Sequence, residues 1–168
     1  MTSFKHVFSA CLLLAMLAWT STPAKATIFD FITDLNGSNE VPANASPATG
    51  SGIFSYDDVS NDLTYHITFS GLVATETAAH FHVAPPGVAG PVVFPLPLGS
   101  PKDGVWAGLS AANETALLTG NIYVNVHSTL FPGGEIRGQL TLVPEPSTLV
   151  LGALAFVGLV WARRRLRR

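Results

Sequence analysis

The middle of the chain alternates hydrophobic and polar residues with a period of two. The alternation is clearest over residues 63–69, 122–127 and 136–142, where an apolar residue, or Gly138, occupies every second position. Successive side chains of a β-strand point to opposite faces, so each stretch predicts a strand with one buried face. The first of these strands is predicted to end at the Ser70-Gly71 turn.

Weaker versions of the same pattern predict five more strands, at residues 28–35, 52–56, 78–83, 91–94 and 115–118. Gly and Pro residues interrupt the chain between most of them, as turns require. No stretch of residues 27–142 has a clear helical period, and the small polar residues from Asn36 to Ser51 predict a loop. Many short strands at this spacing predict an all-β fold, either an antiparallel Greek-key sandwich or a barrel.

The first 26 residues have the pattern of a secretory signal peptide. Lys5 and His6 precede an apolar run over residues 7–19, and Ala24 and Ala26 give the small-x-small pattern that precedes a secretory cleavage site. We therefore expect a signal helix within residues 1–26 and a mature chain that begins at Thr27.

The last part of the chain, residues 143–168, combines three features in a fixed order. The motif Pro144-Glu145-Pro146 comes first, an apolar stretch from Leu149 to Ala162 follows, and the stretch is closed by a cluster of basic residues, Arg163, Arg164, Arg165, Arg167 and Arg168. The apolar stretch is shorter than the ~20 residues of a usual membrane-spanning helix, and it spans if its flanking residues enter the headgroup region. Because clustered arginines stay in the cytoplasm, everything before this C-terminal transmembrane helix is predicted to be exported.

This arrangement closely resembles the PEP-CTERM sorting signal of Gram-negative bacteria. The resemblance implies that an exosortase reads the signal after the secretion machinery has exported the chain. It also implies removal of the tail near Pro144-Glu145-Pro146, which would send the mature protein from the inner membrane to the cell envelope or the extracellular matrix. The alternative is that residues 143–168 form a plain membrane anchor that is not removed.

The formal charge of −2 hides a separation between the parts of the chain. Residues 27–146 hold all eleven acidic residues but only two basic ones, Lys102 and Arg137, which gives this part a formal charge of −9. Such an acidic surface excludes nucleic acid as a partner. The only cysteine, Cys11, lies in the predicted signal peptide, so a single domain of about 120 residues must fold without disulfides.

Several short motifs in this part of the chain resemble the CHRD domain, a module named from chordin and found in many exported bacterial proteins. They are Gly37-Ser38-Asn39-Glu40-Val41-Pro42, Leu63-Thr64-Tyr65, Ala79-His80-Phe81-His82, Tyr123-Val124-Asn125-Val126-His127-Ser128 and Pro132-Gly133-Gly134-Glu135-Ile136-Arg137-Gly138-Gln139-Leu140. The resemblance covers residues 31–142, so the domain is assigned to residues 27–142. It implies an exported binding or structural module and names no general activity.

Histidines offer the only chemistry that the sequence suggests. His80 and His82 are two apart on a predicted strand and therefore project from one face, and His127 supplies a third imidazole if its strand lies beside theirs. Three neutral imidazoles suit copper or zinc better than magnesium or calcium. The structural alternative is that these histidines only hydrogen-bond to the backbone or to Asn125. His66 stands alone and is predicted to be a solvated residue.

The His-x-His pair and the third histidine also resemble the copper ligands of Cu,Zn superoxide dismutases. Arg137 is then comparable to the active-site arginine of those enzymes, and Glu135, on the same face, allows an ion pair or a contact with a ligand or anion. No bridging histidine and no zinc-binding loop are visible, and hydrolase and nucleotide-binding motifs are also absent from the sequence.

The sequence therefore predicts a non-enzymatic envelope or matrix component that binds a partner, for which exopolysaccharide or matrix proteins are the expected candidates. Trp106 and Tyr123 could stack on a sugar, although aromatic residues of a β domain more often belong to its core. The alternative function is a periplasmic or extracellular copper- or zinc-binding protein, with metal-dependent redox activity as its enzymatic form.

Overall fold

The computed structural model describes residues 26–144, and the predicted signal helix and transmembrane helix lie outside them. No helix of the described part is long and apolar enough to cross a membrane. The elements are β1 (Ile28–Asn36), the 3₁₀ helix η1 (Gly37–Asn39), β2 (Thr49–Asp57), β3 (Asp62–Ser70), β4 (Glu76–Val83), β5 (Val92–Leu96), β6 (Lys102–Trp106), α1 (Ala111–Leu118), β7 (Ile122–Ser128), β8 (Ile136–Gln139) and β9 (Thr141–Leu142).

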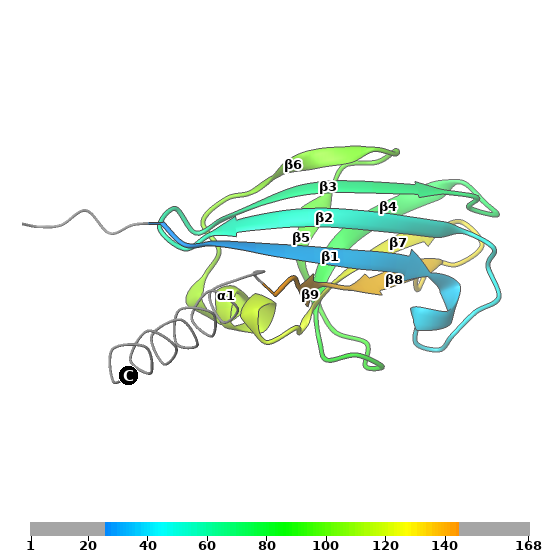
Figure 1. The fold of residues 1–168 in the computed structure, drawn as a ribbon. Helices are drawn as coiled ribbons and strands as arrows, with labels where there is room; N and C mark the ends of the chain where they lie inside the picture. The colour runs from blue at the N-terminus through cyan, green and yellow to red at the C-terminus, as the bar shows by residue number, and fades with distance from the viewer. Residues whose placement is uncertain (1–25, 145–168) are drawn as a thin grey trace, which may run out of the picture.

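The strands form one antiparallel sheet that curls into a nearly closed barrel or sandwich, which confirms the all-β prediction. Their order is β5-β4-β7-β8-β1-β2-β3-β6, with β9 beside β1. Figure 1 shows β1, β2, β3 and β6 as one layer, with β4, β5 and β7 in the layer behind it. The two end strands, β5 and β6, are consecutive in the chain, and their rings of Phe94 and Trp106 stack 5.1 Å apart between the layers.

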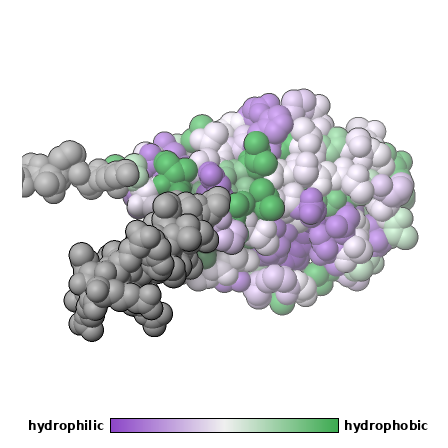
Figure 2. Space-filling view, in the orientation of Figure 1, coloured by the Kyte–Doolittle hydropathy of each residue, from purple (hydrophilic) through white to green (hydrophobic). Residues whose placement is uncertain are grey.

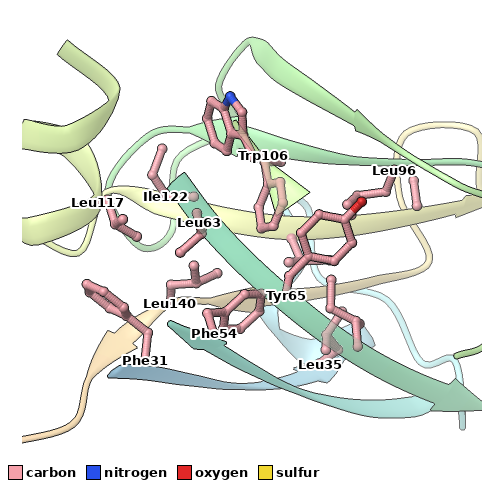
Figure 3. Packing of buried hydrophobic residues seen from close by; sticks show 14 of the residues in the cluster. Phe31, Leu35, Phe54, Leu63, Tyr65, Leu96, Trp106, Leu117, Ile122 and Leu140 are labelled. Atoms are coloured by element: carbon pink, nitrogen blue, oxygen red, sulfur yellow. The ribbon is translucent and has the colours of Figure 1, made fainter. Parts of the chain in front are cut away.

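The core is filled by the apolar phase of the alternating strands. Phe81 of β4 lies at its centre, with ring centroids 5.6 Å from Tyr65 and 5.4 Å from Trp106. Figure 3 shows Phe54, Leu63 and Tyr65 of the front layer facing this interior. Trp106 and Tyr123 are 5% and 2% exposed, so neither ring is available to stack on a sugar in this structure.

Several elements differ from the prediction. Residues 115–118 were expected as a strand but form the end of α1, because Ser110 caps a run of good helix formers and accepts a hydrogen bond from the backbone N–H of Asn113 (3.3 Å). The apolar pattern of residues 115–118 is too short to distinguish a strand from a helical turn. The 36–51 stretch is mostly loop, but it contains η1, and β2 already begins at Thr49.

Strand β6 was not predicted because only one of its three inward positions, Trp106, is apolar. Lys102 is fully buried, and Gly104 faces the ring of Tyr65, so neither contributes to an alternating pattern. The expected strand over residues 136–142 is also interrupted at Leu140, which separates β8 from β9.

Gly138 in β8 allows a close approach to β1. A Cβ atom at this position would overlap Thr33 Oγ1 and would lie 2.7 Å from the carbonyl oxygen of Asp34. We expect Gly138→Ala to lower the free energy of unfolding by about 1–3 kcal/mol, because backbone cannot move aside as a flexible side chain can. Urea unfolding measures the change, and Gly133→Ala, where nothing lies within 4 Å, is the control that should change little.

The outer face of the front layer is partly apolar. Figure 2 shows hydrophobic residues gathered near the middle of this face, and Ile32, Ile53 and Val105, each about half exposed, line a shallow pocket there. His66 lies at the same pocket, where its Nδ1 is 2.5 Å from Asp103. Within the described part of the chain, the only cluster of three metal-ligating side chains lies elsewhere, on the outer face of the back layer.

Candidate metal centre

Polar side chains occupy the outer face of β4, β7 and β8, opposite the core. Two rows of paired residues cross these strands, His80–Asn125–Arg137 and His82–Tyr123–Gln139. The residues between them, such as Phe81 and Val124, point into the core. This face is nevertheless largely buried, because the loops at residues 37–47, 84–91 and 129–135 contact its side chains.

The three predicted histidines come together on this face. His80 Nδ1 lies 3.2 Å from His127 Nε2, and one nitrogen from each of the three rings lies within 4.8 Å of the others. His82 is buried, and the other two rings are half-buried. The condition for His127 to join the pair is met, because β7 lies beside β4 and Ala78 pairs with His127 in the register of the two strands.

Backbone carbonyl groups fix the orientation of two of the rings. His82 Nδ1 donates to the carbonyl oxygen of Gly90 (2.9 Å), and His127 Nδ1 donates to that of Pro132 (3.0 Å). Each of these rings therefore keeps the lone pair on Nε2, and the Nε2 of His82 is buried without a hydrogen-bond partner in the described structure. A second hydrogen bond to a carbonyl is the usual support of a metal-bound histidine.

Burial also favours the neutral form of the three rings. Desolvation lowers the pKa of His80, His82 and His127 below the ordinary value of 6.5. The neighbouring histidines and Arg137 lower the pKa of His82 further, while its hydrogen bond to Gly90 opposes the shift. Neutral imidazole is the form that binds a metal ion, so the cluster is ready to do so at neutral pH.

Arg137 and Glu135 are both buried and do not pair with each other. Arg137 donates to the carbonyl oxygens of Val88 (2.8 Å) and Pro85 (3.3 Å), so it holds the loop that contains Gly90. Its guanidinium carbon lies 3.5 Å from the centre of the Tyr123 ring. The predicted contact of Arg137 with an anion or ligand stays a prediction.

Glu135 holds a different part of the structure. Its Oε1 accepts hydrogen bonds from the hydroxyl of Ser46 and from the backbone N–H of Val73, both at 2.7 Å. It thereby connects the start of β8 to two loops. A contact between Glu135 and a ligand likewise stays a prediction.

Sequence reasoning named Asn125 only as an alternative hydrogen-bond partner of the histidines, and it missed Tyr123 as a support of the site. Tyr123 stacks on His82, with ring centroids 4.9 Å apart and an angle of 15°, and Asn125 lies between the histidines and Glu40. Both residues occupy the polar phase of the same alternation as His127, so that pattern was the available signal. No sequence signal indicated the carbonyl groups of Gly90 and Pro132, because the conformation of their loops decides where these groups point.

Comparison with known proteins identifies both parts of the chain. A family model for the CHRD domain matches residues 31–140, and a model for the PEP-CTERM protein-sorting motif matches residues 142–165. No curated protein and no solved structure matches the chain. The sorting motif marks the protein for export and for recognition by an exosortase. Because the first match covers most of the chain, the protein belongs to the CHRD domain family.

Proposed function

We propose that this protein is an exported component of the cell envelope or matrix whose CHRD domain binds a copper or zinc ion through His80, His82 and His127. The observation that carries this proposal is the convergence of three imidazole nitrogens within 4.8 Å. The hydrogen bonds of His82 and His127 to carbonyl groups support it, because they place the proton on Nδ1 and the lone pair on Nε2 of each ring.

The donor set decides the class of metal. Three neutral imidazoles suit copper and zinc, whereas magnesium and calcium prefer oxygen ligands. Bonds of about 2.0–2.1 Å in a trigonal or tetrahedral site place ligand nitrogens about 3.3–3.6 Å apart. The more distant ring nitrogens therefore need to draw together, and the contact of His80 Nδ1 with His127 Nε2 must open, because the lone pair of His127 Nε2 accepts the proton of His80 Nδ1 there. Three protein ligands leave a position for water or another small ligand.

The proposed role is metal binding without catalysis. Redox activity would require copper, since zinc does not change its oxidation state. The rings of Trp106 and Tyr123 are buried and do not face solvent, so they do not form a binding surface for exopolysaccharide. Exopolysaccharide or matrix proteins would therefore bind to other surfaces of the domain.

Processing would separate this domain from the membrane. Within the described residues, the last backbone hydrogen bond to the sheet comes from Val143, which donates to the carbonyl oxygen of Asp30 (2.8 Å). The Pro144-Glu145-Pro146 motif follows at once, so we propose that exosortase cuts directly beyond the folded domain. The arginine cluster of residues 163–168 and the transmembrane helix would stay behind in the inner membrane.

Metal titration of the full-length protein, purified in detergent without a His tag, tests the proposed site. We expect about one equivalent of copper or zinc to bind to the protein and no specific binding by the His80→Ala/His82→Ala double variant, which lacks two ligands. His66→Ala removes an exposed histidine at the front layer and is the matched control. Equal binding by the double variant and the control, or no binding by the unmodified protein, would refute the metal function.

A further inference from the structure

Tyr123 makes two different contacts with the support of His82. The face of its ring stacks on the His82 imidazole, at a centroid distance of 4.9 Å. Its hydroxyl oxygen accepts a hydrogen bond from the backbone N–H of Gly90 (3.0 Å). The carbonyl oxygen of the same glycine accepts the hydrogen bond from His82 Nδ1 (2.9 Å). Tyr123 thus contacts both His82, the proposed metal ligand, and Gly90, whose carbonyl group fixes the tautomer of His82.

The peptide groups of Gly90 are held firmly in this place. A Cβ atom at Gly90 would overlap the carbonyl group of Val83, so the glycine lets the loop return against the end of β4. The backbone N–H of Val83 donates to the carbonyl oxygen of Pro91 (3.1 Å), which closes the loop at its base. The loop therefore presents the carbonyl oxygen of Gly90 to His82 from a defined direction.

The opposite face of the Tyr123 ring is covered by Arg137. The guanidinium carbon lies 3.5 Å from the ring centre, and the guanidinium group also donates to two carbonyl oxygens of the loop. Arg137, Tyr123 and His82 therefore form a stack of three planar groups. Tyr123 is only 2% exposed, so its ring has no freedom to leave the stack.

We infer that Tyr123 is a positioning residue of the metal centre, which sets the plane and tautomer of His82 and thereby the affinity for the metal. The inference rests on the proposed function, since a metal ion is what the free Nε2 of His82 would bind. The stack fixes the plane of the imidazole ring. The hydroxyl of Tyr123 fixes the Gly90 peptide, which keeps the proton on Nδ1 and the lone pair on Nε2.

Two substitutions separate these contributions. Tyr123→Phe keeps the stacked ring but loses the hydroxyl contact with Gly90, and we expect metal affinity to fall about 10-fold. Tyr123→Leu loses both contacts, and a loss of about 100-fold is expected, because supporting residues of metal ligands typically contribute 10- to 100-fold. Tyr65→Phe is the matched control. It removes a hydroxyl from a buried tyrosine of the front layer that makes no described side-chain hydrogen bond, and it should leave affinity unchanged.

The experiment measures zinc and copper affinity of the full-length protein and its variants, together with ¹⁵N NMR of the histidine rings in the metal-free state. We expect His82 to carry its proton on Nδ1 in the unmodified protein and in Tyr65→Phe, and to show a mixture of tautomers in the Tyr123 variants. A general loss of packing would not select one tautomer of one histidine.

The possible failures can be distinguished. If the unmodified protein binds metal and both Tyr123 variants match its affinity and its His82 tautomer, the inference is wrong and the proposed function stands. If no protein binds metal, the proposed function is wrong, and the inference about affinity falls with it. The NMR result then still shows whether Tyr123 orients His82. Tyr123→Phe preserves the volume of the ring, so the test survives if Tyr123→Leu does not fold.

Discussion

Replacing Lys102 with alanine is expected to lower the free energy of unfolding by about 3–5 kcal/mol, because it leaves a buried carboxylate without its cation. Lys102 is fully buried in β6 and its ammonium group donates to Glu76 Oε1 (2.5 Å) and to the carbonyl oxygens of Pro97 (2.6 Å) and Gly99 (2.8 Å). All three donors of the ammonium group are therefore used. The ion pair joins the end strand β6 to β4, near the place where the two ends of the sheet meet.

Urea unfolding of the full-length protein in mild detergent measures the effect, and a double variant tests its cause. In Lys102→Met/Glu76→Gln neither charge remains, so we expect this variant to be more stable than Lys102→Ala, since replacing both partners of a buried pair costs much less than removing one. His66→Ala, which breaks the exposed contact with Asp103, should cost no more than about 1 kcal/mol. A loss below about 1 kcal/mol for Lys102→Ala would show that water replaces the lysine.

The alternating strands could be predicted because burial on one face is a local property of the sequence. Leu63, Tyr65 and Ile67 form the buried row of β3, and Tyr65 and Phe81 meet in the core as the period of two requires. Strand β6 could not be predicted, because two of its three inward positions hold Lys102 and Gly104. A lysine is acceptable there only when a carboxylate from a distant strand and two loop carbonyl groups reach it, and no local pattern records those partners.

The residues of the candidate site could be predicted from the sequence, but their arrangement in space could not. His80 and His82 share a face by spacing alone, and the family resemblance drew attention to His127. The distances between the rings follow from the pairing of β4 with β7, which the sequence did not specify. The supporting groups come from loops, such as the carbonyl oxygen of Gly90, and a loop's conformation depends on contacts made far away in the chain, here with Arg137.

Glu40 shows how a buried acid beside the site is accommodated. It is 7% exposed, and Asn125 Nδ2 lies 3.4 Å from its Oε2. Its other oxygen, Oε1, and the Oδ1 of Asn125 are both buried without a hydrogen-bond partner in the described structure, and both lie against Gly134. A proton on Oε1 would let Glu40 donate to Asn125 Oδ1, and one hydrogen bond would then satisfy both atoms. Burial raises the pKa of Glu40 to about 7, although Arg137 opposes the shift.

This pKa predicts how stability depends on pH. Because the folded protein holds the proton of Glu40 more tightly than the unfolded chain, whose ordinary pKa is 4.5, the contribution of this group is complete below pH 4.5. It is lost progressively as pH rises to about 7, and remains lost above that. The difference between the two pKa values corresponds to a loss on the order of 3 kcal/mol.

Glu40→Gln should remove this dependence, because glutamine is uncharged at every pH and its amide can donate to Asn125 Oδ1. We expect the variant to match the unmodified protein near pH 4.5 and to exceed its free energy of unfolding by about 2–3 kcal/mol at pH 8. Urea unfolding of the metal-free proteins from pH 4.5 to 8 makes the comparison. The histidines and other acids titrate in both proteins, so the difference between the two curves reports Glu40 alone. Parallel curves would mean that Glu40 is ionised in the folded protein at neutral pH, and that its Oε1 has a partner other than a proton.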